Sequence, residues 1–191
     1  EVLRSQNFEA TFFQLLRLLS ETVAAIDINK LNGEQVAAGR DCFTIFYRRF
    51  RSAYISARDT IPVPDEIKMI QLGYANFYKD NQGDVGHYFR TLYNIVKFVH
   101  TSSAEDKRLY TNLIRAQLSS QELLLLFYNC LTDLGTEKFK PLIEEYAFLK
   151  TLPVSSLINS SHANFYNPSA FGQPTADLAP TASDLSKNSV N

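Results

Sequence analysis

The densest group of side chains that could do chemistry is the run Gly86-His87-Tyr88-Phe89-Arg90-Thr91-Leu92-Tyr93. In a helix, the advance of about 100° per residue places His87, Arg90 and Asn94 on one face. Histidine can move a proton near neutral pH, and arginine can hold a phosphate through two hydrogen bonds. Such a pair could serve phosphodiester cleavage or anion recognition. The alternative is an ordinary polar helix face whose residues bond to the backbone and carboxylates of neighbouring helices.

A second polar group, Arg115, Gln117 and Glu122, lies at the junction of two predicted helices. A cation late in a helix is favoured by the helix dipole, and Glu122 occupies the glutamate position of the capping pattern Ser119-Ser120-Gln121-Glu122. Structural reasons therefore compete with a functional role here too. The full candidate cluster comprises His87, Tyr88, Arg90, Tyr93, Asn94, Arg115, Gln117 and Glu122.

Three arginines form a candidate basic patch, Arg48, Arg51 and Arg58, interleaved with Tyr47, Phe50 and Tyr54. Basic and aromatic residues alternate in this way in proteins that bind single-stranded nucleic acid. Here the aromatic residues occupy the stripe expected to face the core, so the arginines are interpreted as a solvated face. Such a face could meet anionic headgroups if the domain lies close to a bilayer.

The overall composition provides no sign of cofactor chemistry. The net charge is −1 over 191 residues, so no global field attracts nucleic acid, which is not expected as a partner. The three histidines and two cysteines lack metal-ligand spacing, and the sequence contains no phosphate-binding loop or nucleophile elbow. We therefore expect no metal or cofactor, a non-enzymatic role rather than an enzymatic one, and Cys42 and Cys130 as reduced, buried residues.

The helices that must position these residues follow from apolar residues at three- and four-residue steps, which predict an all-α, irregular bundle of about seven helices. The first two span about 8–28 and 34–58, with Lys30-Leu31-Asn32-Gly33 read as the turn between them. The third starts at Pro64 and reaches about 79, and the fourth spans 84–100 after a turn at 80–84. The last three begin at capping patterns in 102–106 and 119–122 and at Pro141, the final one ending near 150. No alternating pattern or hairpin argues for a sheet.

The same spacing assigns faces to the later helices. Helix 84–100 is expected to bury Val85, Phe89, Leu92, Val96 and Val99, and the next helix to turn Leu109, Leu113 and Ala116 inward. Residues 123–127 are apolar all round, which predicts a helix at the centre of the bundle.

The composition changes at residue 151, so we divide the chain into a helical bundle, 1–150, and a Ser/Asn/Pro-rich tail, 151–191. Such a composition is typical of a linker. The tail nevertheless contains apolar residues spaced like anchors, which favours a segment packed on the bundle or on a neighbouring copy: Leu157, Phe165, Tyr166, Phe171 and Leu178.

Three stretches of this sequence resemble the phage abortive infection proteins of the AbiC-like group. They are the run 86–93, the run 110–129 and, less specifically, the opening Phe8-Glu9-Ala10-Thr11-Phe12-Phe13-Gln14-Leu15-Leu16. The agreement in order and spacing covers about residues 8–153.

The resemblance implies a role in bacterial antiphage defence, in which the infected cell stops growing or dies before phage progeny are released. It also implies that N-terminal transmembrane helices, missing from this sequence, hold this soluble portion on the cytoplasmic side of the bacterial inner membrane. It assigns no catalytic residues.

Three functions remain open. The first is a non-enzymatic sensor or effector that binds a phage component or itself, as a homo-oligomer, and acts through the membrane anchor. The second is a ribonuclease like the helical toxin nucleases, using His87 and Arg90. Those enzymes place Arg four to six residues before His, whereas here His87 precedes Arg90. The third is a structural oligomerisation module.

Overall fold

The computed structural model describes residues 2–61 and 65–173, and within them it confirms an all-α fold. Pro64 and Leu178 lie outside the described residues. The α-helices are α1 (Val2–Ala24), α2 (Cys42–Arg58), α3 (Glu66–Asn81), α4 (His87–Thr101), α5 (Lys107–Ala116), α6 (Ser120–Asn129) and α7 (Lys140–Glu145). Shorter elements are the strands β1 (Asp27–Asn29) and β2 (Gln35–Ala38), the 3-10 turn η1 (Gly39–Asp41) and the π-helical turn η2 (Gln82–Gly86).

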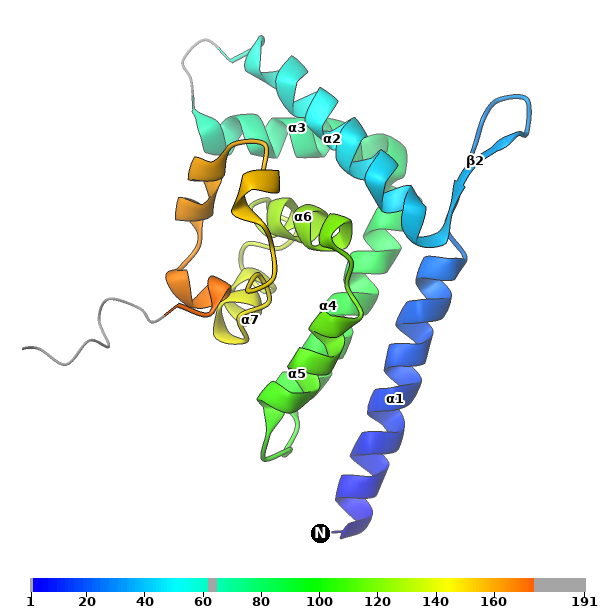
Figure 1. The fold of residues 1–191 in the computed structure, drawn as a ribbon, viewed down its shortest axis with the longest axis vertical. Coiled ribbons are helices and arrows are strands. Elements are labelled where there is room, and N and C mark those ends of the chain that lie inside the picture. Colours follow the sequence, from blue (N-terminus) through cyan, green and yellow to red (C-terminus); the bar gives the residue numbers. More distant parts are fainter. Residues whose placement is uncertain (1, 62–64, 174–191) are drawn as a thin grey trace, which may run out of the picture.

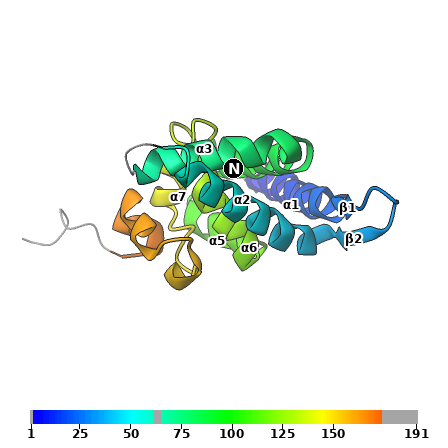
Figure 2. The same ribbon diagram turned by 90° about the horizontal axis from the view of Figure 1, so that it is seen from above.

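The apolar helix α6 lies at the centre, as its composition predicts. Residues 122–131 are all buried, and α6 contacts both α2 and α3, which lie side by side across one end of the molecule (Figure 1). Helix α1 packs along α4 on the other side, and the view from above shows the β1–β2 hairpin projecting beyond it (Figure 2). The predicted inward residues of α4 are all buried, and so are both free cysteines, Cys42 and Cys130.

The region between α1 and α2 corrects the sequence prediction. Helix α1 ends at Ala24, and residues 27–38 form an antiparallel hairpin where the sequence indicated a helix end followed by a second helix. The dipeptide Asn32-Gly33 makes its turn, with Gly33 at a φ of 83° and the Lys30 amide donating to the Glu34 carbonyl (2.8 Å). Asn-Gly suits such a turn because glycine adopts positive φ without steric cost. Helix α2 therefore begins only at Cys42.

A second correction concerns residues 80–84, predicted as a turn. The chain instead continues through the π-helical turn η2, and α4 leaves the end of α3 in a new direction (Figure 1). Asn81 marks the change: its φ is −125°, its side-chain amide donates to the Phe77 carbonyl (2.7 Å), and it accepts a hydrogen bond from Arg49 (2.7 Å). A side chain that competes for backbone partners in this way disrupts the regular helical pattern.

The face predicted for α5 is wrong. Leu109, Leu113 and Ala116 are exposed, whereas Thr111 and Ile114 are buried. The Thr111 hydroxyl donates to the Lys107 carbonyl (3.1 Å), which allows this polar residue to face the core.

The predicted ends of two helices also shift. Asp106, not the serines before it, caps α5 by accepting a hydrogen bond from the Leu109 amide (2.9 Å). Helix α7 ends at Glu145 rather than near 150, because Ala147 has a φ of 52°, outside the helical region.

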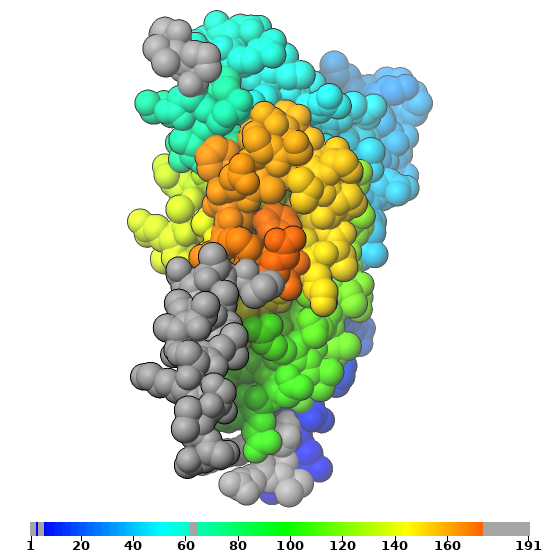
Figure 3. All heavy atoms as spheres, turned by 60° about the vertical axis from the view of Figure 1, so that its left-hand side comes forward, coloured from blue at the N-terminus to red at the C-terminus, as the bar shows by residue number. Residues whose placement is uncertain are grey.

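The described part of the Ser/Asn/Pro-rich segment packs on the bundle through three 3-10 turns, η3 (Val154–Ser156), η4 (Ser160–Phe165) and η5 (Pro168–Phe171). Figure 3 shows these residues, in orange, covering one face of the molecule. Leu157 and Tyr166 are buried, and Phe165 and Phe171 pack partly buried against the core. The Tyr166 hydroxyl donates to the Phe127 carbonyl of α6 (2.6 Å).

Candidate functional site

Helix α4 divides the candidate cluster between two opposite faces. Tyr88 is fully buried, whereas His87, Arg90 and Asn94 are exposed. Two residues along a helix differ by about 200° around its axis, so Tyr88 and Arg90 point in opposite directions. Tyr88 and Arg90 therefore belong to two separate sites, one enclosed and one open to solvent.

The enclosed site is built around the carboxylate of Glu122, which is 1% exposed. Ser119 and Glu122 form the predicted capping box at the start of α6, with the Ser119 amide donating to Glu122 Oε2 (2.8 Å). The Tyr88 hydroxyl donates to Oε1 (2.8 Å), and the Arg40 Nε lies 3.1 Å from Oε2. A buried charge needs such partners, because desolvation without them is costly.

Burial first, and then the negative charge of Glu122, raise the pKa of Tyr88 well above its usual value. Tyr88 thus remains a proton donor and cannot act as a base near neutral pH. Arg40, which sequence analysis did not single out, also donates to the Gln117 carbonyl (2.8 Å). We call Arg40, Tyr88, Ser119 and Glu122 the Glu122 network. It joins η1, α4 and the start of α6.

The remaining predicted residues of the second polar group have structural partners. The Arg115 guanidinium donates to the Ala147 carbonyl (2.9 Å), just where the backbone leaves the helical region after α7. Gln117 contacts the Glu122 network only through its backbone carbonyl, which accepts the hydrogen bond from Arg40. The structure therefore brings Tyr88, Gln117 and Glu122 together, and places Arg115 at a separate junction.

The open site is a pocket of about 280 Å³ on the other side of α4. It lies where η2, the first turns of α4, the end of α6 and the loop before α7 meet. Four of its nine lining residues are aromatic, and the rings of Tyr93 and Phe139 meet edge to face with centroids 5.5 Å apart. We call it the Arg90 pocket; its lining residues are Tyr78, Gly86, Phe89, Arg90, Tyr93, Asn129, Leu134, Lys138 and Phe139.

Two cations reach this pocket from different elements, Arg90 from α4 and Lys138 from the loop before α7. Both are exposed, and neither has an ion pair or side-chain hydrogen bond within the described part of the chain. Asn129 is buried, and its side-chain amide donates to the Tyr74 hydroxyl (3.0 Å), which leaves its carboxamide oxygen available at the pocket. These groups can hold an anion and a neutral polar group.

Gly86 makes room for this arrangement. A Cβ at position 86 would collide with the Tyr78 hydroxyl and would lie 3.1 Å from the Arg90 guanidinium. The glycine in the sequence run 86–93 therefore lets two polar groups lie against the backbone at the pocket. His87 and Asn94 do not line the pocket, so the structure does not assemble the predicted His87–Arg90 pair there.

The candidate basic patch remains spread along α2. Arg48, Arg51 and Arg58 are all exposed, as predicted. Arg48 lines an open hollow of about 640 Å³ beneath the β1–β2 hairpin, and Arg58 lies 3.7 Å from Asp59. Arg51 and Arg58 line neither this hollow nor the Arg90 pocket.

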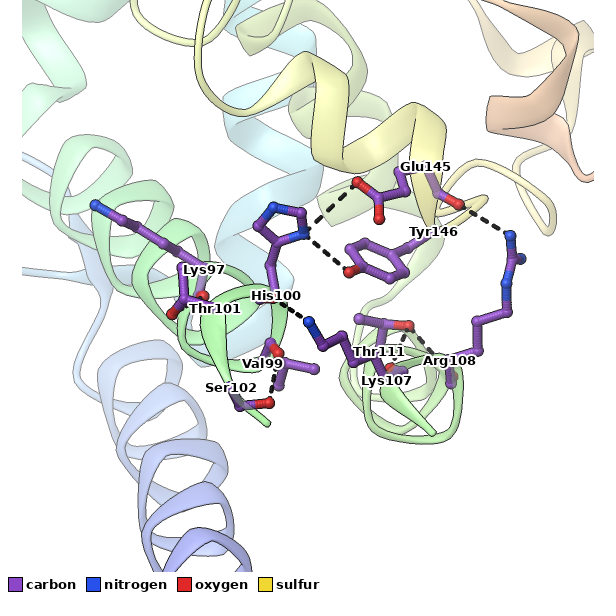
Figure 4. A network of polar contacts seen from close by, with 10 residues as sticks. All are labelled: Lys97, Val99, His100, Thr101, Ser102, Lys107, Arg108, Thr111, Glu145 and Tyr146. Carbon is purple, nitrogen blue, oxygen red and sulfur yellow. Dashed lines mark hydrogen bonds and ion pairs between the residues drawn. The ribbon is translucent and has the colours of Figure 1, made fainter. Parts of the chain in front are cut away.

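Two histidine clusters escaped sequence analysis. Figure 4 shows His100 at the end of α4, with its Nδ1 2.9 Å from the Tyr146 hydroxyl and 3.6 Å from Glu145 Oε2. Lys107 donates to the His100 carbonyl, and Arg108 donates to the Glu145 carbonyl, so this cluster connects α4, α5 and α7. Burial is the main cause that raises the pKa of Tyr146 to about 12, and the negative charge of Glu145 is the second cause.

The second cluster holds the Ser/Asn/Pro-rich segment. His162 is fully buried, with Nε2 2.8 Å from Glu66 Oε2 and Nδ1 3.0 Å from the Tyr128 hydroxyl. The Tyr54 hydroxyl also donates to Glu66 (2.6 Å). His162 and Glu66 are 96 residues apart, so no local spacing could have indicated the pair.

Among the described residues, no group of His, Cys, Asp and Glu side chains is arranged to hold a metal ion. Within the same residues, every helix is either too short or too polar to cross a bilayer.

The fold and its two sites thus define an all-α domain with an enclosed carboxylate network and an open basic and aromatic pocket. Residues 80–157 match the family described as "Putative phage abortive infection protein". This stretch contains α4 to α7, the whole candidate cluster and every residue of the Arg90 pocket except Tyr78. The match confirms the resemblance drawn from residues 86–93 and 110–129, and it implies a role in phage abortive infection. Comparisons with curated proteins and with solved structures found no match.

Proposed function

We propose that this chain is the non-enzymatic sensor or effector domain of a bacterial antiphage defence protein. One observation carries the non-enzymatic part: the Arg90 pocket is lined by binding groups and by no carboxylate, imidazole, thiol or aliphatic hydroxyl. Those groups perform most acid–base and nucleophilic catalysis, whereas lysine and tyrosine side chains, which this pocket does contain, act as bases or nucleophiles near neutral pH only when their surroundings lower their pKa. In this proposal, the signal is the binding of a ligand in the Arg90 pocket. The element that responds to it is η2, the bend between α3 and α4.

The family resemblance supports the finer part of the proposal. The domain acts through N-terminal transmembrane helices, on the cytoplasmic side of the bacterial inner membrane, and its output is arrest or death of the infected cell. Association with a phage component or a second copy belongs to the same proposal. The exposed apolar side chains of the neighbouring helices α1 and α5 support it, with Phe13 56% and Leu109 51% exposed.

Phage plating on cells that carry the full-length protein tests the function, with membrane potential followed during infection. Arg90→Gln and Lys138→Gln are expected to abolish protection, and His87→Ala to retain it. Loss of protection in His87→Ala, with RNA cleavage in the wild type, would instead support the ribonuclease alternative. If Arg90→Gln and Lys138→Gln both protect fully, the pocket is not the sensor.

Light scattering on the purified chain tests association. A Leu113→Ser or Phe13→Ser variant is expected to reduce the mass if α1 and α5 mediate self-association. If the wild-type chain already has the mass of a monomer, the proposed partner is the phage component and not a second copy.

A further inference from the structure

We propose that the Arg90 pocket binds a nucleoside monophosphate, or a ligand that presents the same two parts, a flat ring and a dianionic phosphate. The inference rests on the proposed function, because it names the ligand of the proposed sensor. It begins from the fact that Arg90 and Lys138 converge on one pocket while neither is neutralised by a carboxylate in the described part of the chain.

Two unpaired cations at one pocket are matched by a doubly charged ligand group. A phosphate monoester carries a charge of about −1.5 to −2 at pH 7, whereas a carboxylate carries only one. The guanidinium of Arg90 can donate two parallel hydrogen bonds to phosphate oxygens, and the Lys138 ammonium adds a point charge. The two residues come from α4 and from the loop before α7, so a phosphate between them would also join these elements.

The rest of the pocket suits a flat ring. Phe89, Tyr93 and Phe139 line it, and aromatic side chains stack on nucleobases whatever their sequence. The carboxamide oxygen of Asn129 has no donor among the described residues and can accept a hydrogen bond from a ring amino group.

Size limits the ligand further. The volume of about 280 Å³ is near the lower end of the range typical of small-molecule sites, about 300–1,000 Å³. A mononucleotide suits that space better than a dinucleotide or a nucleic acid strand. The groove-tracking run of cations that single-stranded nucleic acid requires is also missing from the lining.

Isothermal titration calorimetry of the chain with adenosine monophosphate tests this inference, with adenosine and inorganic phosphate as separate probes. We expect saturable binding of the monophosphate and binding weaker by about tenfold or more for either part alone, because adenosine lacks the charge-assisted hydrogen bonds and inorganic phosphate lacks the stacked ring. Arg90→Gln and Lys138→Gln should each weaken binding by a similar factor. Lys79→Gln is the matched control, since it removes the same charge from an exposed residue that does not line the pocket.

The outcomes separate this inference from the proposed function. No binding of adenosine monophosphate, or equal binding by wild type, Arg90→Gln and Lys138→Gln, overturns the inference. Inorganic phosphate that binds as tightly as the nucleotide overturns the ring part. If the variants lose nucleotide binding but still protect against phage, the ligand stands and the proposed sensor role fails. If the wild type does not bind the nucleotide while the variants lose protection against phage, the sensor role stands and the ligand class is wrong.

Discussion

The two faces of α4 carry polar residues of similar type in opposite physical states. On the inner face, Tyr88 is buried and donates a hydrogen bond to the buried carboxylate of Glu122 from α6. On the outer face, Arg90 lines an open pocket without a partner in the described part of the chain. A satisfied buried network fixes how η1, α4 and α6 pack, and its groups are already occupied. The unpaired cations are the groups left free to bind something else.

Residue type alone therefore does not separate structure from function. Tyr88 and Arg90 stand two residues apart in the most chemically suggestive run of the sequence. Only their surroundings assign one to the architecture and the other to a binding site. Four substitutions, taken from the largest expected effect to the smallest, test this division.

Removing the central carboxylate should have the largest effect on stability. Glu122→Ala leaves the Tyr88 hydroxyl and the Ser119 amide without their acceptor, whereas Arg40 is 51% exposed and keeps its hydrogen bond to the Gln117 carbonyl. Leaving a buried donor without an acceptor costs about 1–3 kcal/mol and losing a helix cap about 0.5–2 kcal/mol, so we expect a loss of about 2–5 kcal/mol in the free energy of unfolding by urea. Glu21→Ala is the control, because its pair with Arg17 is exposed and is worth about 0–1 kcal/mol. Similar losses in the two variants would remove the distinction between the Glu122 network and an exposed ion pair.

The two glycines of η2 offer a matched pair for the pocket. A Cβ at position 86 collides with the Tyr78 hydroxyl, whereas one at position 83 meets nothing within 4 Å. We expect Gly86→Ala to cost about 1 kcal/mol, the lower end of the range for overpacking, because the atoms that the Cβ would meet are the ends of the Tyr78 and Arg90 side chains. Gly83→Ala should be neutral or stabilising by up to about 1 kcal/mol, because it reduces the entropy of the unfolded chain. Urea unfolding measures both, and equal effects would mean that position 86 tolerates a side chain.

Glu66 is intermediate between the two sites, since its side chain is 40% exposed yet partnered by Tyr54 and His162. The hydrogen bond from Tyr54 lowers the pKa of Glu66 below its ordinary value of 4.5, and the hydrogen bond and charge of His162 lower it further. A carboxyl group with a lowered folded-state pKa adds stability above its unfolded pKa, and that stability is lost as the pH falls through the folded pKa.

Wild type should therefore lose more stability than Glu66→Gln between about pH 6 and about pH 3, and partial exposure keeps the difference below about 1 kcal/mol. Thermal unfolding followed by circular dichroism across that range measures it. Parallel pH curves for the two proteins would show that the Glu66 carboxylate gains nothing from its partners.

The sequence was informative where periodicity and caps act locally. The buried face of α4, the enclosed helix α6 and the Ser119–Glu122 capping box all follow from residues a few positions apart. The hairpin at 27–38 was missed because Asn32-Gly33 fits a helix end and a strand turn equally well. The outward face of α5 was missed because a stripe of leucines does not say which neighbour it meets.

The partners across the fold could not be predicted at all. Arg40 meets Glu122, Lys138 shares a pocket with Arg90, and His162 meets Glu66 only after the helices have packed. In each pair, the packing of other elements brings the two side chains together. No spacing within the sequence indicates such a pair. The candidate residues were therefore identified in part, while their division into an enclosed and an open site required the structure.

The substitution with the smallest expected effect on stability, Arg90→Gln, is the most direct test of the open site. Arg90→Gln removes an exposed cation that has no partner in the described part of the chain, so the free energy of unfolding should change by less than about 0.5 kcal/mol. Lys138→Gln should behave alike for the same reason. A loss above about 1 kcal/mol in either variant would assign that cation to the architecture, as with Glu122. Unchanged stability together with lost protection against phage would leave binding as the function of these cations, because nothing else that depends on them would have changed.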